Sequence, residues 1–67
     1  MPILSLDQRT QLSEIRYQLQ QQDIFLQQIK QKIMTMHGTE INEIQIIMDK
    51  MLQENRYQLQ LLEGLLR

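Results

Sequence analysis

Apolar side chains recur at alternating steps of three and four residues along two stretches of this chain, and neither proline nor glycine occurs between Ser5 and Gly38. This spacing is typical of amphipathic helices that pack along one heptad seam. The first predicted seam is Leu12, Ile15, Leu19, Gln22, Leu26, Ile29, Ile33 and Met36, and the second is Ile41, Ile44, Met48, Leu52, Asn55, Leu59, Leu62 and Leu66. The pattern predicts two long helices.

The ends of both helices carry their own signals. Ser5 and Gln8 match a capping box, in which the serine side chain accepts a hydrogen bond from a first-turn amide. Gly38 suits the left-handed position that follows a helix, and Thr39 is a suitable N-cap for the next one. We therefore predict an all-α fold with helices at about 6–37 and 40–66, in a single domain over 1–67.

The two seams match each other when the chain is folded about Gly38 as an antiparallel hairpin. Gln22 then lies opposite Asn55, so the two polar members of the seams form one polar core layer. Charged residues beside the seams complement each other in the same register, and the expected pairs are Arg16 with Glu63, Asp23 with Arg56, and Lys30 with Asp49. This agreement favours a hairpin over one continuous helix.

The length of the chain implies that the hairpin needs a partner. A chain of 67 residues is too short for one core to stabilise it comfortably. Small proteins compensate with disulfides, a metal or association, but this sequence has no cysteine and one histidine. We therefore expect no metal site and no cofactor, and we expect a homodimer in which two hairpins form a four-helix bundle.

The second helix has more apolar residues than the first helix can cover. On the flank away from the charge pairs, Phe25 is expected to face Met51. An aliphatic strip of this length on a soluble monomer promotes aggregation, so it predicts an interface. The predicted interface with a partner or a second copy is Phe25, Ile47, Met51, Gln58, Leu61 and Leu65.

Two arginine–tyrosine pairs outside the seams are candidate contacts for a further protein, because these residue types dominate binding hot spots. They are Arg16 with Tyr17 and Arg56 with Tyr57. His37 is expected in the last turn of the first helix, where a cation interacts favourably with the helix dipole. No serine or threonine is placed with a histidine and an acid, and no glycine-rich phosphate loop occurs, so we expect no enzymatic activity.

The expected function is a small protein–protein interaction module, such as an adaptor, a regulator or an assembly subunit, that works as a homodimeric bundle. The alternative is a small helical co-chaperone or anti-factor whose apolar strip covers a helix of a different protein. The expected location is the cytoplasm. No apolar run approaches the ~20 residues that span a bilayer, and the opening residues lack a basic signal region.

A dimer of helical hairpins is also similar in architecture to the Rop-type plasmid regulators, which bind RNA. That similarity would place RNA on the basic residues of the first helix, which are Arg9, Arg16, Lys30 and Lys32. The formal net charge of −1 argues against this reading, because nucleic acids and anionic membranes both require a basic face. We therefore expect neither a nucleic acid nor a membrane as a partner.

Overall fold

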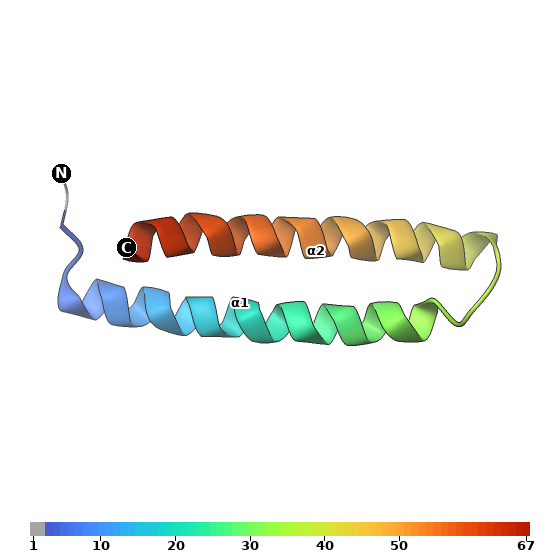
Figure 1. Ribbon diagram of the computed structural model, residues 1–67, viewed down its shortest axis with the longest axis horizontal. Helices are drawn as coiled ribbons and strands as arrows, with labels where there is room; N and C mark the ends of the chain where they lie inside the picture. Colours follow the sequence, from blue (N-terminus) through green and yellow to red (C-terminus); the bar gives the residue numbers. More distant parts are fainter. Residues whose placement is uncertain (1–2) are drawn as a thin grey trace.

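The computed structural model describes residues 3–67, which form two helices joined by a short loop. Helix α1 spans Leu6–Ile33 and helix α2 spans Thr39–Leu66, and each has 28 residues. The helices run antiparallel, so the start of α1 and the end of α2 lie at the end opposite to the loop (Figure 1). The predicted all-α hairpin is confirmed.

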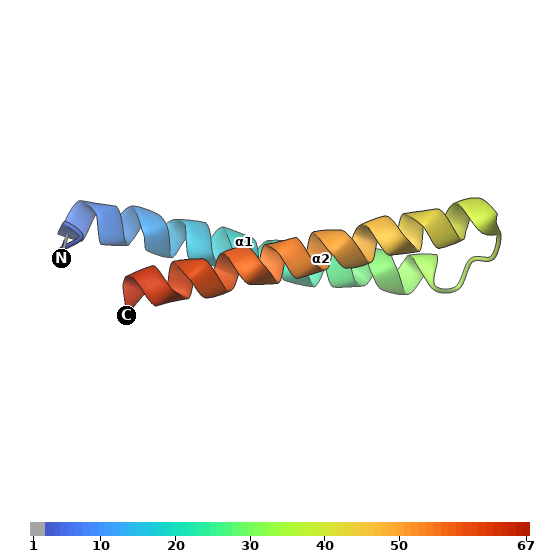
Figure 2. The ribbon, with the colours of Figure 1, turned by 90° about the horizontal axis from the view of Figure 1, so that it is seen from above.

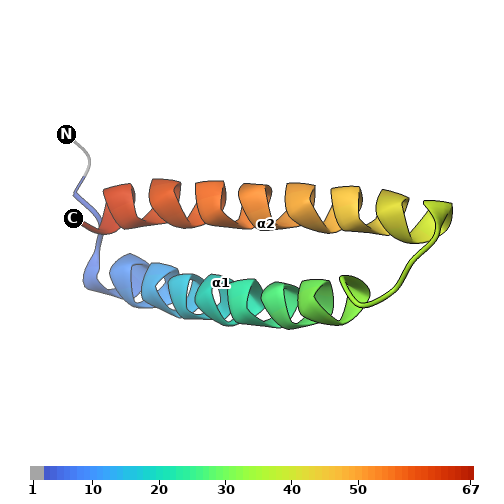
Figure 3. The ribbon, with the colours of Figure 1, turned by 45° about the vertical axis from the view of Figure 1, so that its right-hand side comes forward.

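The hairpin is long and flat, with extents of 51 × 18 × 13 Å. Seen from above, the two helices cross each other at a shallow angle near their middle (Figure 2). They stay side by side when the molecule is turned about its vertical axis (Figure 3). Such a shallow crossing is the geometry expected when heptad rows of two helices interlock.

The start of α1 is the predicted capping box. The Ser5 hydroxyl oxygen accepts a hydrogen bond from the Gln8 backbone N–H at 3.1 Å, and the Gln8 side-chain oxygen accepts one from the Ser5 N–H at 3.0 Å. These bonds satisfy two backbone donors at the helix start, where amides lack partners within the helix.

The end of α1 differs from the prediction, because the helix stops at Ile33 rather than at residue 37. The Thr35 hydroxyl donates a hydrogen bond to the Lys32 carbonyl at 2.8 Å. In a continuing helix this carbonyl would accept from the amide of residue 36, so the side chain competes with the helix. Met36 and His37 consequently lie in the connecting loop, and their predicted places in the seam and in the last turn are wrong.

Gly38 is the N-cap of α2 and does not cap the end of α1. Its φ of 136° and ψ of 160° lie far from the left-handed helical cap that was predicted, in a region essentially reserved for glycine. Its carbonyl accepts the Asn42 N–H at 3.1 Å, as an N-cap carbonyl does. Thr39 is the first residue of α2, and no side chain caps this end of the helix, so its predicted N-cap role is also wrong.

The residues that each helix turns toward the other repeat at steps of four and three. On α1 they are Leu12, Arg16, Leu19, Asp23, Leu26, Lys30 and Ile33, and on α2 they are Ile41, Gln45, Met48, Leu52, Asn55, Leu59, Leu62 and Leu66. These two rows are termed the inner seam. This differs from the predicted seams. On α1, Arg16, Asp23 and Lys30 stand in the row where Ile15, Gln22 and Ile29 were predicted, and on α2, Gln45 stands where Ile44 was predicted.

The inner seam contains a small core. Leu26, Met48 and Leu52 form the buried cluster, with Ile29 and Ile33 packed against it. Among the described residues only one further apolar side chain, Leu62, is buried. Apart from the buried Asn55, the other members of the two rows are half-buried, and they include the charged residues Arg16, Asp23 and Lys30 on α1.

Ion pairs along one flank establish the register. Two of the three predicted pairs form, Asp23 with Arg56 at 2.9 Å and Lys30 with Asp49 at 2.5 Å. The third predicted pair, Arg16 with Glu63, does not form within residues 3–67. Instead, the Arg9 guanidinium donates to the Leu66 carbonyl at 2.6 Å and ties the end of α2 to the start of α1.

Candidate interaction surface

Each helix carries a second row of residues beside the inner seam. On α1 this row is Ile15, Gln18, Gln22, Phe25 and Ile29, and on α2 it is Ile44, Ile47, Met51, Glu54, Gln58, Leu61 and Leu65. All are exposed except Ile29, which is half-buried. Both rows keep steps of three and four throughout, which is the spacing of a seam for another helix. These twelve residues are termed the outer face.

The two rows border one shallow hollow in the middle of the hairpin. This hollow has a volume of about 180 Å³ and is lined by Gln22, Leu26, Met51, Glu54, Asn55 and Gln58. Its floor contains the buried Leu26 and Asn55, and its rim contains residues of both outer rows. The outer rows of α1 and α2 therefore belong to the same flank of the molecule.

The outer face is apolar at both ends and polar in its middle. Toward the loop lie Phe25, Ile29, Ile44, Ile47 and Met51, and toward the open end lie Ile15, Leu61 and Leu65. Between them are Gln18, Gln22, Glu54 and Gln58, which are termed the polar band. Phe25 is 60% exposed and Leu65 is 59% exposed, so large apolar side chains face solvent in both apolar parts.

The outer face is poor in charge and lies on a broad side of the hairpin. Glu54 is the one charged residue among its twelve members. The broad side of the hairpin measures 51 by 18 Å, and a specific interface buries about 800 Å² on each partner, so this side is large enough to contain one. The centre of such interfaces is typically poor in charge.

All six residues of the predicted interface lie on the outer face: Phe25, Ile47, Met51, Gln58, Leu61 and Leu65. Two exposed apolar members of the face, Ile15 and Ile44, were missed because they were assigned to the seams between the helices. Ile29 was assigned to a seam as well, and it does pack against the buried core. The unbroken three–four spacing from Ile44 to Leu65 is the signal that could have identified the α2 row. The role of these residues as an interface remains a prediction.

The predicted polar layer is only half formed within the hairpin. Asn55 is buried, with 4% of its surface exposed, and its side-chain amide donates to the Leu19 carbonyl at 2.9 Å. Gln22 is exposed on the outer face, so it lines the same hollow as Asn55 without being its hydrogen-bond partner.

On the opposite flank, ion pairs connect α1 and α2. Arg56 donates to the Asp23 carboxylate, and Gln27 donates to it as well. The hydrogen bond from Arg56, followed by that from Gln27, lowers the pKa of Asp23 below its ordinary value, and burial opposes this shift only in part. The same hydrogen bond raises the pKa of Arg56.

In the predicted arginine–tyrosine contacts, the tyrosines are exposed but the arginines are not free. Tyr17 and Tyr57 are exposed, at 62% and 61%. Arg56, in contrast, is engaged by Asp23, and Arg16 is half-buried in the inner seam. The two tyrosines are therefore available to a partner, whereas Arg56 is already in an ion pair and Arg16 is partly covered.

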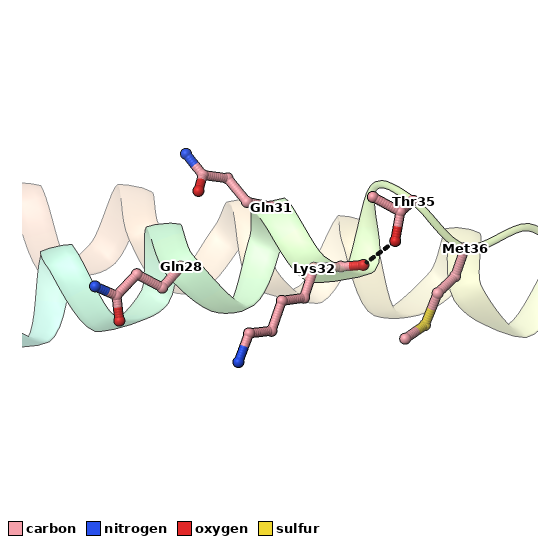
Figure 4. Close-up of a pocket in the computed structure, with 5 residues that line it drawn as sticks. All are labelled: Gln28, Gln31, Lys32, Thr35 and Met36. Carbon is pink, nitrogen blue, oxygen red and sulfur yellow. Dashed lines mark hydrogen bonds between the residues drawn. The ribbon is translucent and has the colours of Figure 1, made fainter.

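The basic residues of α1 do not form a common patch. The Arg9 guanidinium bonds to the Leu66 carbonyl, and Lys30 pairs with Asp49. Lys32 lines an open hollow of about 720 Å³ at the end of α1, together with Gln28, Gln31, Thr35 and Met36. These side chains point in different directions rather than toward a common point, and the Thr35–Lys32 hydrogen bond is internal to the chain (Figure 4).

Residues 3–67 contain no group of three histidine or acidic side chains arranged to hold a metal ion. Neither α1 nor α2 has both the length and the apolar character needed to cross a membrane. Comparison with models of protein families, with curated proteins and with solved structures finds no match for this chain.

Proposed function

We propose that this chain is a non-enzymatic protein–protein interaction module that works as a homodimer, in which two hairpins pack through their outer faces into a four-helix bundle. The observation that carries the proposal is the exposed row of α2, which has heptad spacing and one charge among seven residues. With its inner and outer rows, α2 has two packing seams about 100° apart around the helix. Each helix of a four-helix bundle needs two such seams, because it has two neighbours.

The small core of the hairpin supports association. Only four apolar side chains are buried among the described residues, whereas eight apolar side chains lie on the outer face. Covering those that are half-exposed contributes about 1 kcal/mol each, and thus on the order of 10 kcal/mol over two copies. Association costs about 4–15 kcal/mol in lost freedom, so the gain is large enough to matter.

The chemistry of the polar band supports a second copy as the occupant. The carboxylate of Glu54 only accepts hydrogen bonds, whereas the amides of Gln18, Gln22 and Gln58 both donate and accept. Each copy therefore offers donors for the carboxylate of the other. The face carries no cation that would select an acidic partner. The proposed location of the module is the cytoplasm, as expected from the sequence.

A helix of a different protein is the other occupant to be tested, as in a small co-chaperone or an anti-factor. One observation favours it: Glu54 stands alone as a charge in the face, and a lysine or arginine on a foreign helix would match it well. This alternative predicts a chain that is poorly folded or aggregating alone and that becomes ordered when the partner is added.

A matched pair of substitutions tests the proposal. Met51→Glu puts a charge into the outer face. Ile46→Glu is the control, because Ile46 is also an exposed apolar residue of α2, with 57% of its surface exposed, but lies off that face. We expect Met51→Glu to weaken dimerisation by tenfold or more and Ile46→Glu to leave it unchanged, as measured by light scattering across a concentration series. Equal effects of the two changes, or a dimer that persists in Met51→Glu, would contradict the proposal.

A further inference from the structure

The outer row of α2 has mirror symmetry along its length. Moving outward from its middle, near residue 56, polar Glu54 matches polar Gln58. The next pair, Met51 and Leu61, is apolar, and so is the pair after that, Ile47 and Leu65. An antiparallel contact between two copies of this row would therefore place every apolar residue against an apolar one.

The outer row of α1 repeats this symmetry over its central residues. Gln18 and Gln22 flank a centre near residue 20, and Ile15 and Phe25 lie one step further out. The next positions, Gln11 and Ile29, differ in polarity, so the symmetry covers two steps on this helix. These two steps include both α1 residues of the polar band and the aromatic side chain of Phe25.

The two mirror centres lie at nearly the same height in the hairpin. Asp23 lies beside Arg56 in the observed register, and residue 20 is only three positions from Asp23. The hollow brackets the α2 centre between Glu54 and Gln58, and its lining on α1 begins at Gln22, two positions from residue 20. Three positions correspond to about 4.5 Å along a helix, so a single two-fold axis that crosses the hairpin close to a right angle to its helices can pass near both centres.

We propose that the second copy lies antiparallel across the outer face, with its loop at the open end of the first copy and the two-fold axis through the polar band. This inference rests on the proposed homodimer and specifies its geometry. In this arrangement α1 packs on α1 and α2 on α2 of the second copy, and all neighbouring helices are antiparallel. The expected contacts between copies are Met51 with Leu61, Ile47 with Leu65, Ile15 with Phe25, and Glu54 with Gln58.

The alternative dimer, with both loops at the same end, would place α1 on α2 of the second copy. In that dimer each residue of α1 meets the α2 residue of the second copy that lies at the same distance from the loop. It therefore requires no mirror symmetry along either helix. It would also bring the Phe25 and Met51 side chains of both copies together at the same distance from the loops. The antiparallel dimer places Phe25 against the smaller Ile15, and alternation of large and small residues packs more evenly.

A distance measurement distinguishes the two arrangements. Because the chain has no cysteine, His37→Cys provides a single site in the loop for a spin label. With the axis near residue 20 and a rise of 1.5 Å per residue, the antiparallel dimer separates the two labels by roughly 50 Å. The other arrangement places both labels at one end, within roughly 25 Å of each other. Double electron–electron resonance covers this range.

The outcomes separate the inference from the proposed function. A dimeric mass with the long distance supports both, whereas a dimeric mass with the short distance overturns the antiparallel arrangement alone. A monomeric mass overturns the homodimer and the inference with it. As a second measurement, Met51→Cys mixed with Leu61→Cys should give a disulfide-linked dimer on oxidation, and neither variant should do so alone. Linkage of Met51→Cys with Phe25→Cys instead would indicate the parallel arrangement.

Discussion

At the scale of single residues, Asn55 is the most constrained polar group of the hairpin. It is buried, and its amide donates to the backbone of α1, so it links the two helices at one height. No buried side-chain polar atom among the described residues lacks a partner. A buried amide of this kind costs stability relative to an apolar residue but disfavours shifted registers, because a shift would leave it unpaired.

Asn55→Asp should destabilise the hairpin at neutral pH by about 2 kcal/mol or more, because it replaces a buried donor with a charged acceptor that faces the Leu19 carbonyl. Asn55→Leu is the control, and we expect its effect to be small or stabilising. Urea denaturation followed by helicity at one protein concentration measures both. An Asn55→Asp variant as stable as the unmodified chain at pH 7 would be inconsistent with the observed hydrogen bond.

Acidification tests the contact between Asp23 and Arg56. The pKa of Asp23 is lowered in the folded chain, chiefly by the hydrogen bond from Arg56. Its contribution to stability is therefore present above the ordinary aspartate value of about 3.9 and is lost as the pH falls through the lowered pKa. We expect the unmodified chain to lose more stability between pH 5 and pH 2 than Asp23→Asn does. Parallel pH profiles of the two would argue that the pair is not formed.

At the scale of the elements, the two glycines should respond oppositely to alanine. Gly38 has a φ of 136°, which strains any residue with a Cβ atom, so Gly38→Ala should destabilise the chain by about 1–3 kcal/mol. Gly64 lies within α2, and a Cβ built there has no neighbour within 4 Å, so Gly64→Ala should stabilise it by about 0.5–1 kcal/mol. Thermal melts at equal concentration measure both, and effects of the same sign would contradict this description of the turn.

The hairpin, the start of α1 and the register of the helices could be predicted from the sequence because each has a local or repeated signal. Ser5 and Gln8 specify a cap over three residues, and charges seven residues apart specify the pairing flank. The end of α1 had a weaker signal. Because Gly38 is a strong helix breaker, the end of α1 was predicted just before it. The helix ends earlier, at Ile33, where the Thr35 hydroxyl competes for a helix carbonyl.

The exact packing face was harder to predict, because α2 has two apolar rows. Ile44 fits the three–four spacing of either row, and only the position of α1 decides that Gln45 is covered and Ile44 is exposed. On α1, Asp23 and Lys30 were predicted to flank the seam, whereas both are half-buried in the row that faces α2. The exposure of the outer row of α2 could be predicted in outline, since a row of apolar residues remains after any one seam is assigned, and its role as an interface stays a prediction.

At the scale of the whole molecule, the two flanks of the hairpin differ in kind. One flank carries the ion pairs of Asp23 with Arg56 and of Lys30 with Asp49, which are formed within the chain. The other is the outer face, which is apolar at both ends and has its polar band in the middle. This asymmetry explains why a second copy is expected on one side only, which gives a closed dimer rather than a fibre.

The most direct test of the homodimer is the solution mass of the unmodified chain, measured by light scattering over a range of concentrations with helicity followed in parallel. The monomer mass is 8.1 kDa, so we predict a mass near twice this value together with high helicity that persists at micromolar concentration. Helicity and mass should fall together on dilution, because the outer face stabilises the hairpin only when it is covered. A well-folded, fully helical monomer at the same concentrations would contradict the homodimer.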